Sequence, residues 1–386
     1  MWEMESWRLI DLGRAEPLIA QTFYEAVALA IDRGLSPDTI LLCQPASPYV
    51  CLGFHQELER EIDVEYCREK GLPIIRRSQG GGATYLNSDQ VFYQVVARKG
   101  SSVLPARVED LFRKLLEAPV YVYRKLGLPA EFKPINDVVV RGRKISGNGA
   151  GVMGSAVILV GNIILDLDYD SMSRVLRVPS EKFRDKMAKS MREWVTSLKR
   201  ELEYIPEVEE IKRLLAEAFE HVLGVDLQRS EPSEEEWRIW REEVKPKHLS
   251  KEWLQMRGGR RMGEGVRAVK IAGDRYIVEA DHKARKLIRV RAEVKGWKIL
   301  DASITGDFFM IPEEAVLRLE EALKGAMLSR PHDLELRIKR FFKESEAQIP
   351  GMSPEDFLRA VLKLRDALPP SLPPVESSAN PLRRDG

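Results

Sequence analysis

Two polar, glycine-rich motifs contain the side chains of this sequence that could do chemistry. The first runs from Arg76 to Tyr85 and reads RRSQGGGATY, and the second runs from Asn136 to Asn148 and reads NDVVVRGRKISGN. Together they supply two adjacent arginines, three successive glycines and a lysine just after a turn. Arginine side chains bind phosphate and carboxylate oxygens, so the motifs could hold a carboxylate against a nucleotide phosphate.

The run of glycines in the first motif needs a physical reason. Three glycines in a strand lose much backbone entropy and gain no packing. One explanation is a tight turn or a bulge, and the other is a ligand that lies against exposed backbone amides. Arg76 and Arg77, just before the run, favour the ligand.

The second motif predicts a β-hairpin with Arg141-Gly142 in its turn. On the outgoing strand, a period of two places Lys144, Ser146 and Asn148 on one face. Gly147 and Gly149 leave room for a ligand beside them. The alternative is a solvated lysine near a turn, which is the usual state of such a residue.

The order of the elements predicts an α+β fold, with a mixed, mainly antiparallel sheet flanked by helices. Strands dominate the middle of the first 230 residues, and the regular alternation of a doubly wound sheet is missing. We expect a catalytic domain over residues 1–230 and a helical connection over 231–260. A small C-terminal α/β domain is expected over 261–368, and the proline-rich tail 369–386 is predicted to be disordered.

Composition narrows the function classes. The 386 residues include 61 basic and 60 acidic side chains, which argues against a dedicated nucleic-acid or membrane-surface protein. We see no signal peptide and no apolar run near the ~18 residues that span a bilayer. The three cysteines, Cys43, Cys51 and Cys67, have no metal-binding spacing, so we expect a cytoplasmic protein.

On the two motifs, the chain resembles the lipoate–protein ligase family of the biotin/lipoate ligase superfamily, over about residues 7–203. The family pattern R-R-x-x-G-G-G matches Arg76–Gly82, and its N-D pattern ending in K-(I/V)-(S/A)-G matches Asn136–Gly147. The resemblance implies that ATP and Mg²⁺ convert lipoate or octanoate to an acyl-adenylate with release of pyrophosphate. The acyl group would then pass to a lysine of a lipoyl domain of a 2-oxoacid dehydrogenase E2 subunit, or of a glycine-cleavage H-type protein.

The resemblance also implies roles for individual residues. Lys144 would be the catalytic residue and would stabilise charge on the carboxylate and α-phosphate oxygens. Arg76 or Arg77 would hold phosphates, the three glycines would lie along the acyl chain and adenylate, and Asp137 would contact the nucleotide or its magnesium. The full candidate binding set is Arg76, Arg77, Gly80, Gly81, Gly82, Ala83, Tyr85, Asn136, Asp137, Lys144, Ile145, Ser146, Gly147 and Asn148.

The chain departs from the family pattern in two places. Many members continue the glycine run into His-Asp, where this chain has Leu86-Asn87, and many have His-Gly after the lysine motif, where it has Met153-Gly154-Ser155. Residues 292–309 resemble the family's accessory domain, here fused to the catalytic domain. The basic segment Met172–Arg192 is either a cover over the labile adenylate or a solvated charged helix.

Three rival functions remain open. An octanoyl transferase would take the acyl group from acyl carrier protein without ATP. Related transferases use a cysteine near the lysine motif or in the strand after it, and this chain has none after Cys67. A biotin ligase would show a different glycine motif. A non-catalytic protein that binds lipoyl domains would have no need of Lys144.

Overall fold

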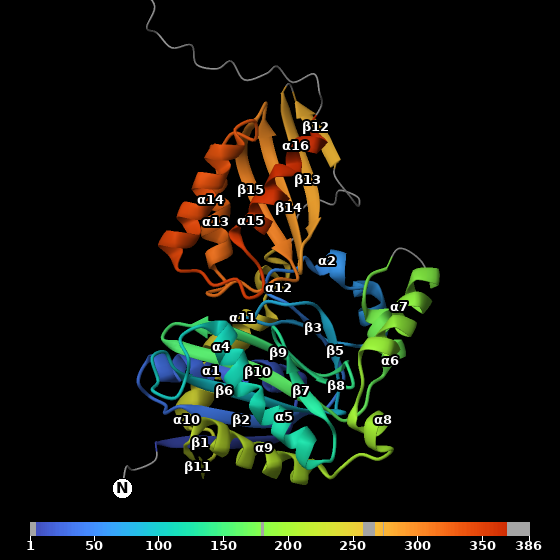
Figure 1. The fold of residues 1–386 in the computed structure, drawn as a ribbon, viewed down its shortest axis with the longest axis vertical. Coiled ribbons are helices and arrows are strands. Elements are labelled where there is room, and N and C mark those ends of the chain that lie inside the picture. Colours follow the sequence, from blue (N-terminus) through green and yellow to red (C-terminus); the bar gives the residue numbers. More distant parts are fainter. Residues whose placement is uncertain (1–4, 179–180, 258–266, 273, 369–386) are drawn as a thin grey trace, which may run out of the picture. The chain divides into compact units, whose positions relative to one another are not determined.

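The computed structural model describes residues 5–178, 181–257, 267–272 and 274–368 (Figure 1). The chain forms two compact units. The first comprises Met1–Gly258 together with Ile311–Glu313, and the second comprises Gly259–Met310 and Glu314–Gly386. The predicted tail, 369–386, lies outside the described residues.

An eight-stranded sheet forms the centre of the first unit. In spatial order its strands are β11 (Asp226–Arg229), β1 (Ser6–Ala15), β2 (Thr39–Pro45), β6 (Gln90–Arg98), β10 (Ala156–Ile164), β9 (Arg143–Met153), β8 (Asp137–Val140) and β7 (Ala130–Lys133). The first three strands are parallel to one another, and every later pair is antiparallel. This mixed, mainly antiparallel sheet confirms the predicted fold class.

Helices cover one face of the large sheet and bury its main apolar core. Three of them, α4 (Val108–Leu115), α5 (Glu117–Lys125) and α9 (Val208–Leu223), pack there around residues such as Tyr93 and Phe219 (Figure 1). The chain leaves α9 at Gly224, whose φ of 71° suits the left-handed conformation that ends many helices.

The opposite face of the large sheet carries helix α1 (Pro17–Asp32) and a second, three-stranded sheet. In spatial order this small sheet contains β4 (Ile74–Arg76), β3 (Tyr49–Leu52) and β5 (Thr84–Leu86). The glycine motif therefore connects the two edge strands of the small sheet. Short helices α2 (Leu58–Glu61) and α3 (Val64–Glu69) lie between β3 and β4 in sequence.

The remaining helices of the first unit follow the two motifs in sequence. They are α6 (Tyr169–Val175), α7 (Glu181–Trp194), α8 (Leu198–Leu202), α10 (Glu234–Ile239), the π-helical turn η1 (Trp240–Val244), α11 (Lys245–Leu249) and α12 (Lys251–Gln255). The segment predicted as a helical connection, 231–260, is thus helical over most of its described length. It packs on α1 through an apolar cluster that includes Ile239, Trp240 and Val244.

The second unit packs helices against a four-stranded antiparallel sheet. Its elements are β12 (Arg267–Ala272), β13 (Arg275–Lys283), β14 (Leu287–Lys295), β15 (Lys298–Gly306), α13 (Ala315–Leu323), α14 (Pro331–Ser345), α15 (Pro354–Leu362) and α16 (Leu364–Ala367). Phe308 and Phe357 are buried with their rings edge to face at 5.3 Å. Phe309, next to Phe308 in the sequence, is buried as well.

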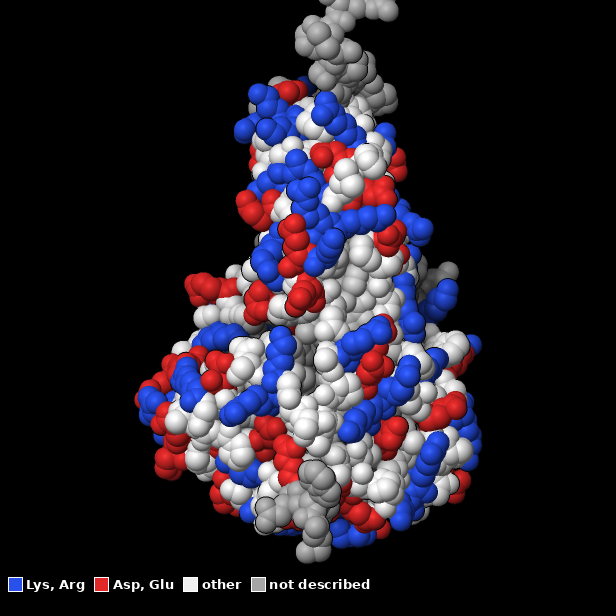
Figure 2. All heavy atoms as spheres, turned by 60° about the vertical axis from the view of Figure 1, so that its left-hand side comes forward, with Lys and Arg blue, Asp and Glu red and all other residues white. Residues whose placement is uncertain are grey.

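Basic and acidic side chains are interspersed on the face shown in Figure 2. Among the described residues, no helix is long and apolar enough to cross a membrane.

Candidate functional site

The predicted hairpin is present and presents Lys144 beside its turn. Arg141 and Gly142 connect β8 to β9 with φ angles of 49° and 77°, the left-handed pair that a type I′ turn requires. The two arginines at this turn share the buried Glu201 carboxylate, which accepts from Arg143 at 2.6 Å and also pairs with Arg141. Lys144, in contrast to Arg141 and Arg143, does not pair with Glu201.

Lys144 forms an ion pair within the hairpin. Its Nζ lies 2.5 Å from Oδ1 of Asp137, and about a third of each side chain is exposed. The backbone carbonyl of Lys144 accepts from the Thr196 amide at 2.8 Å, which ties the strand to the segment after α7. The ammonium is thus held at the surface of the sheet but remains accessible.

A β-bulge in β9 changes which of its side chains share a face, so the prediction for this strand must be corrected. Val138 pairs with Ser146, but Val139 pairs with Lys144, so Ile145 is the extra residue. An extra residue shifts the alternation of side chains by one. Lys144 therefore shares a face with Gly147, whereas Ser146 and Asn148 point to the opposite face, and the predicted polar row is wrong.

The face of Ser146 and Asn148 is part of the main core. Tyr93 donates to Asn148 Oδ1, and its hydroxyl lies 3.3 Å from Ser146 Oγ. Asn136 donates to the Asn148 carbonyl at 2.6 Å, and Asn148 returns a bond of 3.0 Å to the Asn136 carbonyl. These side chains fix the hairpin to the sheet. Ile145 is fully buried in the same core.

A strip of glycines continues from Lys144 along β9. Gly147, Gly149 and Gly151 follow one another at period two, so the strand itself contributes no side chain to that face at these positions. A Cβ added at Gly147 would lie 3.4 Å from Cε of Lys144. The Gly147 amide donates to Asn162 Oδ1 at 2.8 Å. This strip of three glycines leads away from the Lys144 ammonium, and an extended acyl chain could lie along it.

The two motifs meet at the far end of the strip. A Cβ at Gly151 would approach Cγ of Gln79 to 3.2 Å and Oε1 of Glu313 to 2.4 Å. Gln79 directly precedes the three glycines. The structure therefore brings the start of the glycine motif to the strand that carries Lys144.

Arg77 holds the glycine loop from within. Its guanidinium donates to the carbonyls of Gly80 at 2.7 Å and Gly82 at 2.9 Å, and Nη1 lies 3.3 Å from Sγ of Cys51. Gly81 has a φ of 92°, which only glycine adopts readily. Because Arg77 bonds to the loop, the conformation of the three glycines depends on it.

Arg76 has a different position from the one expected of a phosphate ligand. It is fully buried and donates to the carbonyls of Gly53, Phe54 and Gln56 at 2.7–2.9 Å, and to that of Leu254. Its guanidinium thus joins the small sheet to α12. The phosphate role of Arg76 stays untested, and these contacts favour a structural role.

The other candidates of the first motif lie on the face of the small sheet that packs against α2, α3 and α6. Tyr85 is buried, Ala83 is half-buried, and both contact an apolar cluster around Val50 and Leu52. Burial raises the pKa of the Tyr85 hydroxyl. Neither side chain carries a charge at neutral pH that could bind a phosphate.

The described residues contain no metal cage of their own, and the one metal contact that the resemblance implied is Asp137. Nowhere in the described part of the chain do three His, Cys, Asp or Glu side chains gather to hold a metal ion. Asp137, the expected ligand, is paired with Lys144. Mg²⁺ in nucleotide sites usually takes one or two carboxylates together with substrate phosphates, so at Asp137 it would have to compete with the ion pair to Lys144.

The three cysteines are all buried within the first 67 residues of the chain. Burial raises the pKa of the Cys43 thiol to about 12 and that of Cys67 to about 11, so both are protonated near neutral pH. Cys51 is the one cysteine with an arginine against its sulfur. It lies beneath the glycine loop.

The segment expected to cover the site is helical. Residues 172–175 belong to α6 and residues 181–192 to α7, residues 176–178 are not helical, and positions 179–180 lie outside the described residues. Phe183 and Trp194 on α7 are more than half exposed. Whether this segment covers a reactive intermediate remains a prediction.

Two polar residues of the site, Asn162 and Gln90, are not among those predicted from the sequence. Asn162 accepts from the Gly147 amide and donates to Gln90 Oε1 at 2.6 Å. A signal was present, because Asn162 interrupts the apolar run of β10 between Gly161 and Ile163. A polar residue in such a run needs a partner inside the fold.

Comparison with known proteins agrees with this geometry. The family described as "Lipoyl protein ligase A/B catalytic domain" matches residues 16–220. An octanoyltransferase LipM from Kyrpidia tusciae is 31% identical over 273 residues, which cover 65% of this chain and 98% of the relative. A lipoate-protein ligase A subunit 1 from Thermoplasma acidophilum is 31% identical over 53% of this chain and 79% of the relative.

A solved structure shares the fold of the first unit. It is the bi-partite lipoate protein ligase of Thermoplasma acidophilum, described with its E2 lipoyl domain, and is 28% identical with a TM-score of 0.58. The match covers 68% of this chain and all of that one.

These relatives correct the activity expected from the resemblance. The octanoyltransferase matches along nearly its whole length, whereas the ligase subunit matches over about four fifths of its own. The expected ATP-dependent ligation is therefore wrong as the main function, and the octanoyl transfer considered as an alternative agrees better. The expected roles of ATP, an acyl-adenylate and magnesium lose their support together with that reaction.

Proposed function

Because the chain belongs to the lipoyl protein ligase A/B catalytic domain family, we propose that it is an octanoyl transferase. It takes an octanoyl group from a carrier-protein thioester and places it on a lysine of a lipoyl domain. The match to an octanoyltransferase over 98% of that relative's length carries this proposal.

The reaction exchanges a thioester for an amide. The neutral amine of the acceptor lysine attacks the thioester carbonyl, a C–N bond forms, and the C–S bond breaks. The carrier leaves as a thiolate, which takes up the proton released by the amine. No net oxidation occurs, and ATP has no part in the balance.

Lys144 supports this reaction by its charge. The carbonyl oxygen becomes negative as the tetrahedral intermediate forms, and a fixed ammonium beside it lowers that energy. Asp137 keeps the ammonium in place at 2.5 Å. The glycines of β9 let the acyl chain lie along the strand with its carbonyl near Lys144.

Two routes differ in the group that attacks the thioester first, which is either the acceptor lysine or a cysteine of the enzyme. Cys43 and Cys67 are poor thiol nucleophiles because their pKa values are raised. Direct attack by the acceptor lysine needs no enzyme thiol and is the route we propose. An acyl-enzyme on Cys51 would require the buried sulfur beside Arg77 to become accessible.

The test uses a purified lipoyl-domain acceptor and detects acylation by intact mass. Octanoyl-acyl carrier protein is one donor, and free octanoate with ATP and Mg²⁺ is the other. We expect an octanoyl mass shift from the thioester without ATP, its loss in Lys144→Met, and its retention in Cys51→Ser. A shift only with free acid and ATP would overturn the proposal, and an acyl adduct trapped on Cys51 would replace the direct route.

A further inference from the structure

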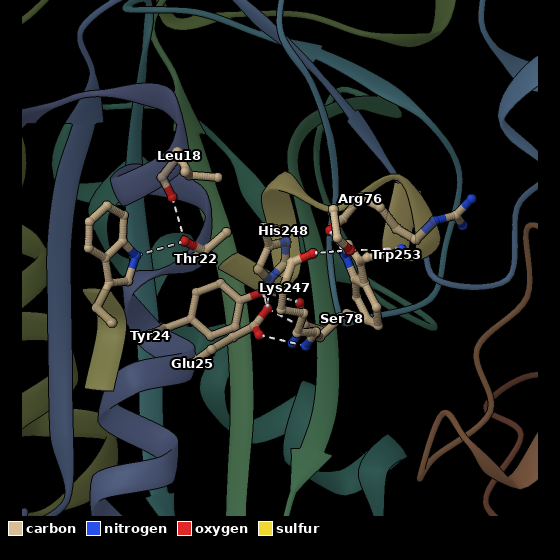
Figure 3. A network of polar contacts seen from close by, with 12 residues as sticks. Leu18, Thr22, Tyr24, Glu25, Arg76, Ser78, Lys247, His248 and Trp253 are labelled. Carbon is tan, nitrogen blue, oxygen red and sulfur yellow. Dashed lines mark hydrogen bonds and ion pairs between the residues drawn. The ribbon is translucent and has the colours of Figure 1, made fainter. Parts of the chain in front are cut away.

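A buried carboxylate lies directly behind the glycine motif (Figure 3). Glu25, on α1, is 1% exposed. Its Oε1 accepts from Ser78 Oγ at 2.7 Å and lies 2.9 Å from His248 Nε2, and its Oε2 accepts from Lys247 Nζ at 2.9 Å. The one carboxylate thus joins α1, the residue two before Gly80, and helix α11.

Further contacts attach the same segment on both sides. Tyr24 donates to Gln79 Oε1 at 2.6 Å, and Lys247 also donates to Ser78 Oγ at 3.1 Å. The indole of Trp253 on α12 donates to the Arg76 carbonyl at 2.9 Å, and its ring lies 4.0 Å from Lys247 Nζ. Figure 3 shows side chains of α1, α11 and α12 converging on Arg76 and Ser78.

The arrangement stiffens the peptide that leads into Gly80–Gly82. Glycines restrict the backbone little, so their conformation depends on how the residues on either side are held. Arg77 holds the loop from within, and the Glu25 network holds Ser78 and Gln79 from behind. The helices that supply Lys247, His248 and Trp253 lie beyond residue 220, where the family match ends.

We propose that Glu25 is a positioning residue for acyl transfer. Its buried carboxylate, held by Lys247 and His248, fixes Ser78 and thereby the glycine loop that lies against the acyl donor. The assignment of the loop to the acyl donor rests on the proposed function, whereas the effect of Glu25 on loop order does not.

The chain contains a matched control for this network. Arg33 at the end of α1 pairs with Glu243 of η1 at 2.6 Å, and both side chains are about 40% exposed. This pair also joins α1 to the later helical segment, but it takes no part in the contacts to Ser78 and Gln79 described above. Glu243→Gln removes an ion pair between the same two segments without touching Ser78 or Gln79.

The experiment compares the full-length wild type with Glu25→Gln, Ser78→Ala and Glu243→Gln. Amide hydrogen exchange of a peptide spanning residues 77–84 reports loop order in the absence of substrate. Steady-state transfer from octanoyl-acyl carrier protein reports KM and kcat separately. We expect exchange in the loop and KM for the donor to rise about tenfold in Glu25→Gln and Ser78→Ala, with kcat changed less. Glu243→Gln should match the wild type in both.

Two outcomes overturn the proposal. One is unchanged exchange of residues 77–84 in folded Glu25→Gln, or in Ser78→Ala if Glu25→Gln does not fold. The other is looser exchange with an unaltered KM, since the network would then have only a structural role. If the wild type transfers no octanoyl group, the proposed function fails, and loop exchange still decides whether Glu25 orders the loop.

Discussion

Lys144 Nζ and Asp137 Oδ1 lie 2.5 Å apart on the neighbouring strands β9 and β8 of one hairpin. The pair faces the bare glycine strip, and the bulge at Ile145 directs it there. An ammonium fixed in this way can stabilise a developing oxyanion without reorganising during the reaction.

Replacing Lys144 by methionine should lower kcat about 10²–10³-fold, since the proposed oxyanion loses its charged partner. The side chain is about one-third exposed, so the free energy of unfolding should change by less than about 1 kcal/mol. Transfer assays and urea unfolding measure the two effects. Lys199→Met is a control, because Lys199 is another exposed lysine paired with one aspartate, Asp166, at 2.7 Å. Equal losses in both variants would contradict a special role for Lys144.

Asp137→Asn should reduce kcat by about tenfold, because the ammonium of Lys144 loses its fixed position. A double-mutant cycle checks the reason. When Lys144 is already methionine, Asp137→Asn should have little further effect, since the two residues act as a unit. Independent, additive losses would show that Asp137 acts on something other than Lys144.

Alanine at two glycines on opposite faces of the large sheet should have different effects. A Cβ at Gly161 would lie 2.0 Å from Asn148 Oδ1 and 2.5 Å from the Tyr93 hydroxyl, so Gly161→Ala should lower the free energy of unfolding by about 1–3 kcal/mol. A Cβ at Gly147 meets only the flexible end of Lys144 and Asn162, at 3.4 Å or more. Gly147→Ala should therefore keep its stability and lose transfer activity. Thermal melts and transfer assays separate the two, and a stability loss at Gly147 as large as at Gly161 would refute the assignment of faces.

Arg76→Met should destabilise the first unit by about 3 kcal/mol or more, because it leaves several buried carbonyls without a donor. Arg76→Lys should restore little, since one ammonium cannot reach all the carbonyls that the planar guanidinium spans. Chemical denaturation measures both. Arg68→Met, at a side chain 76% exposed, supplies the control. A stable Arg76→Met protein with impaired donor binding would instead support a phosphate role.

The ionisation of Glu25 should make the free energy of unfolding depend on pH in the acidic range. Burial alone would raise its pKa, but the charges of His248 and Lys247 and hydrogen bonds from His248 and Ser78 lower it from 4.5 to about 2. A pKa lower in the folded state means that the stabilisation is complete above about pH 4.5 and is lost as the pH falls toward 2. The difference in unfolding free energy between wild type and Glu25→Gln should therefore shrink across this range. A difference that stays constant from pH 6 to pH 2.5 would exclude an ionised Glu25 as its source.

The local features of this protein can be predicted from its amino-acid sequence. The spacing of apolar residues indicated most strands and helices, and the Arg141-Gly142 turn placed Lys144 at the start of β9. The two motifs identified the family because their residue types and spacing are local features. Such features depend on neighbours within a few residues, which the sequence shows directly.

Which side chains share the site depends on contacts between residues far apart in the chain, and these could not be predicted. The bulge opposite Val138 and Val139 turned Ser146 and Asn148 into the core, because pairing with a partner strand overrides the period of two. Arg76 is buried because it contacts both the small sheet and Leu254, which lies far along the chain. Burial of this kind cannot be read from neighbouring residues. Glu25 met Lys247 and His248 across more than 220 residues, and only folding brings such groups together and sets the pKa of a buried carboxylate.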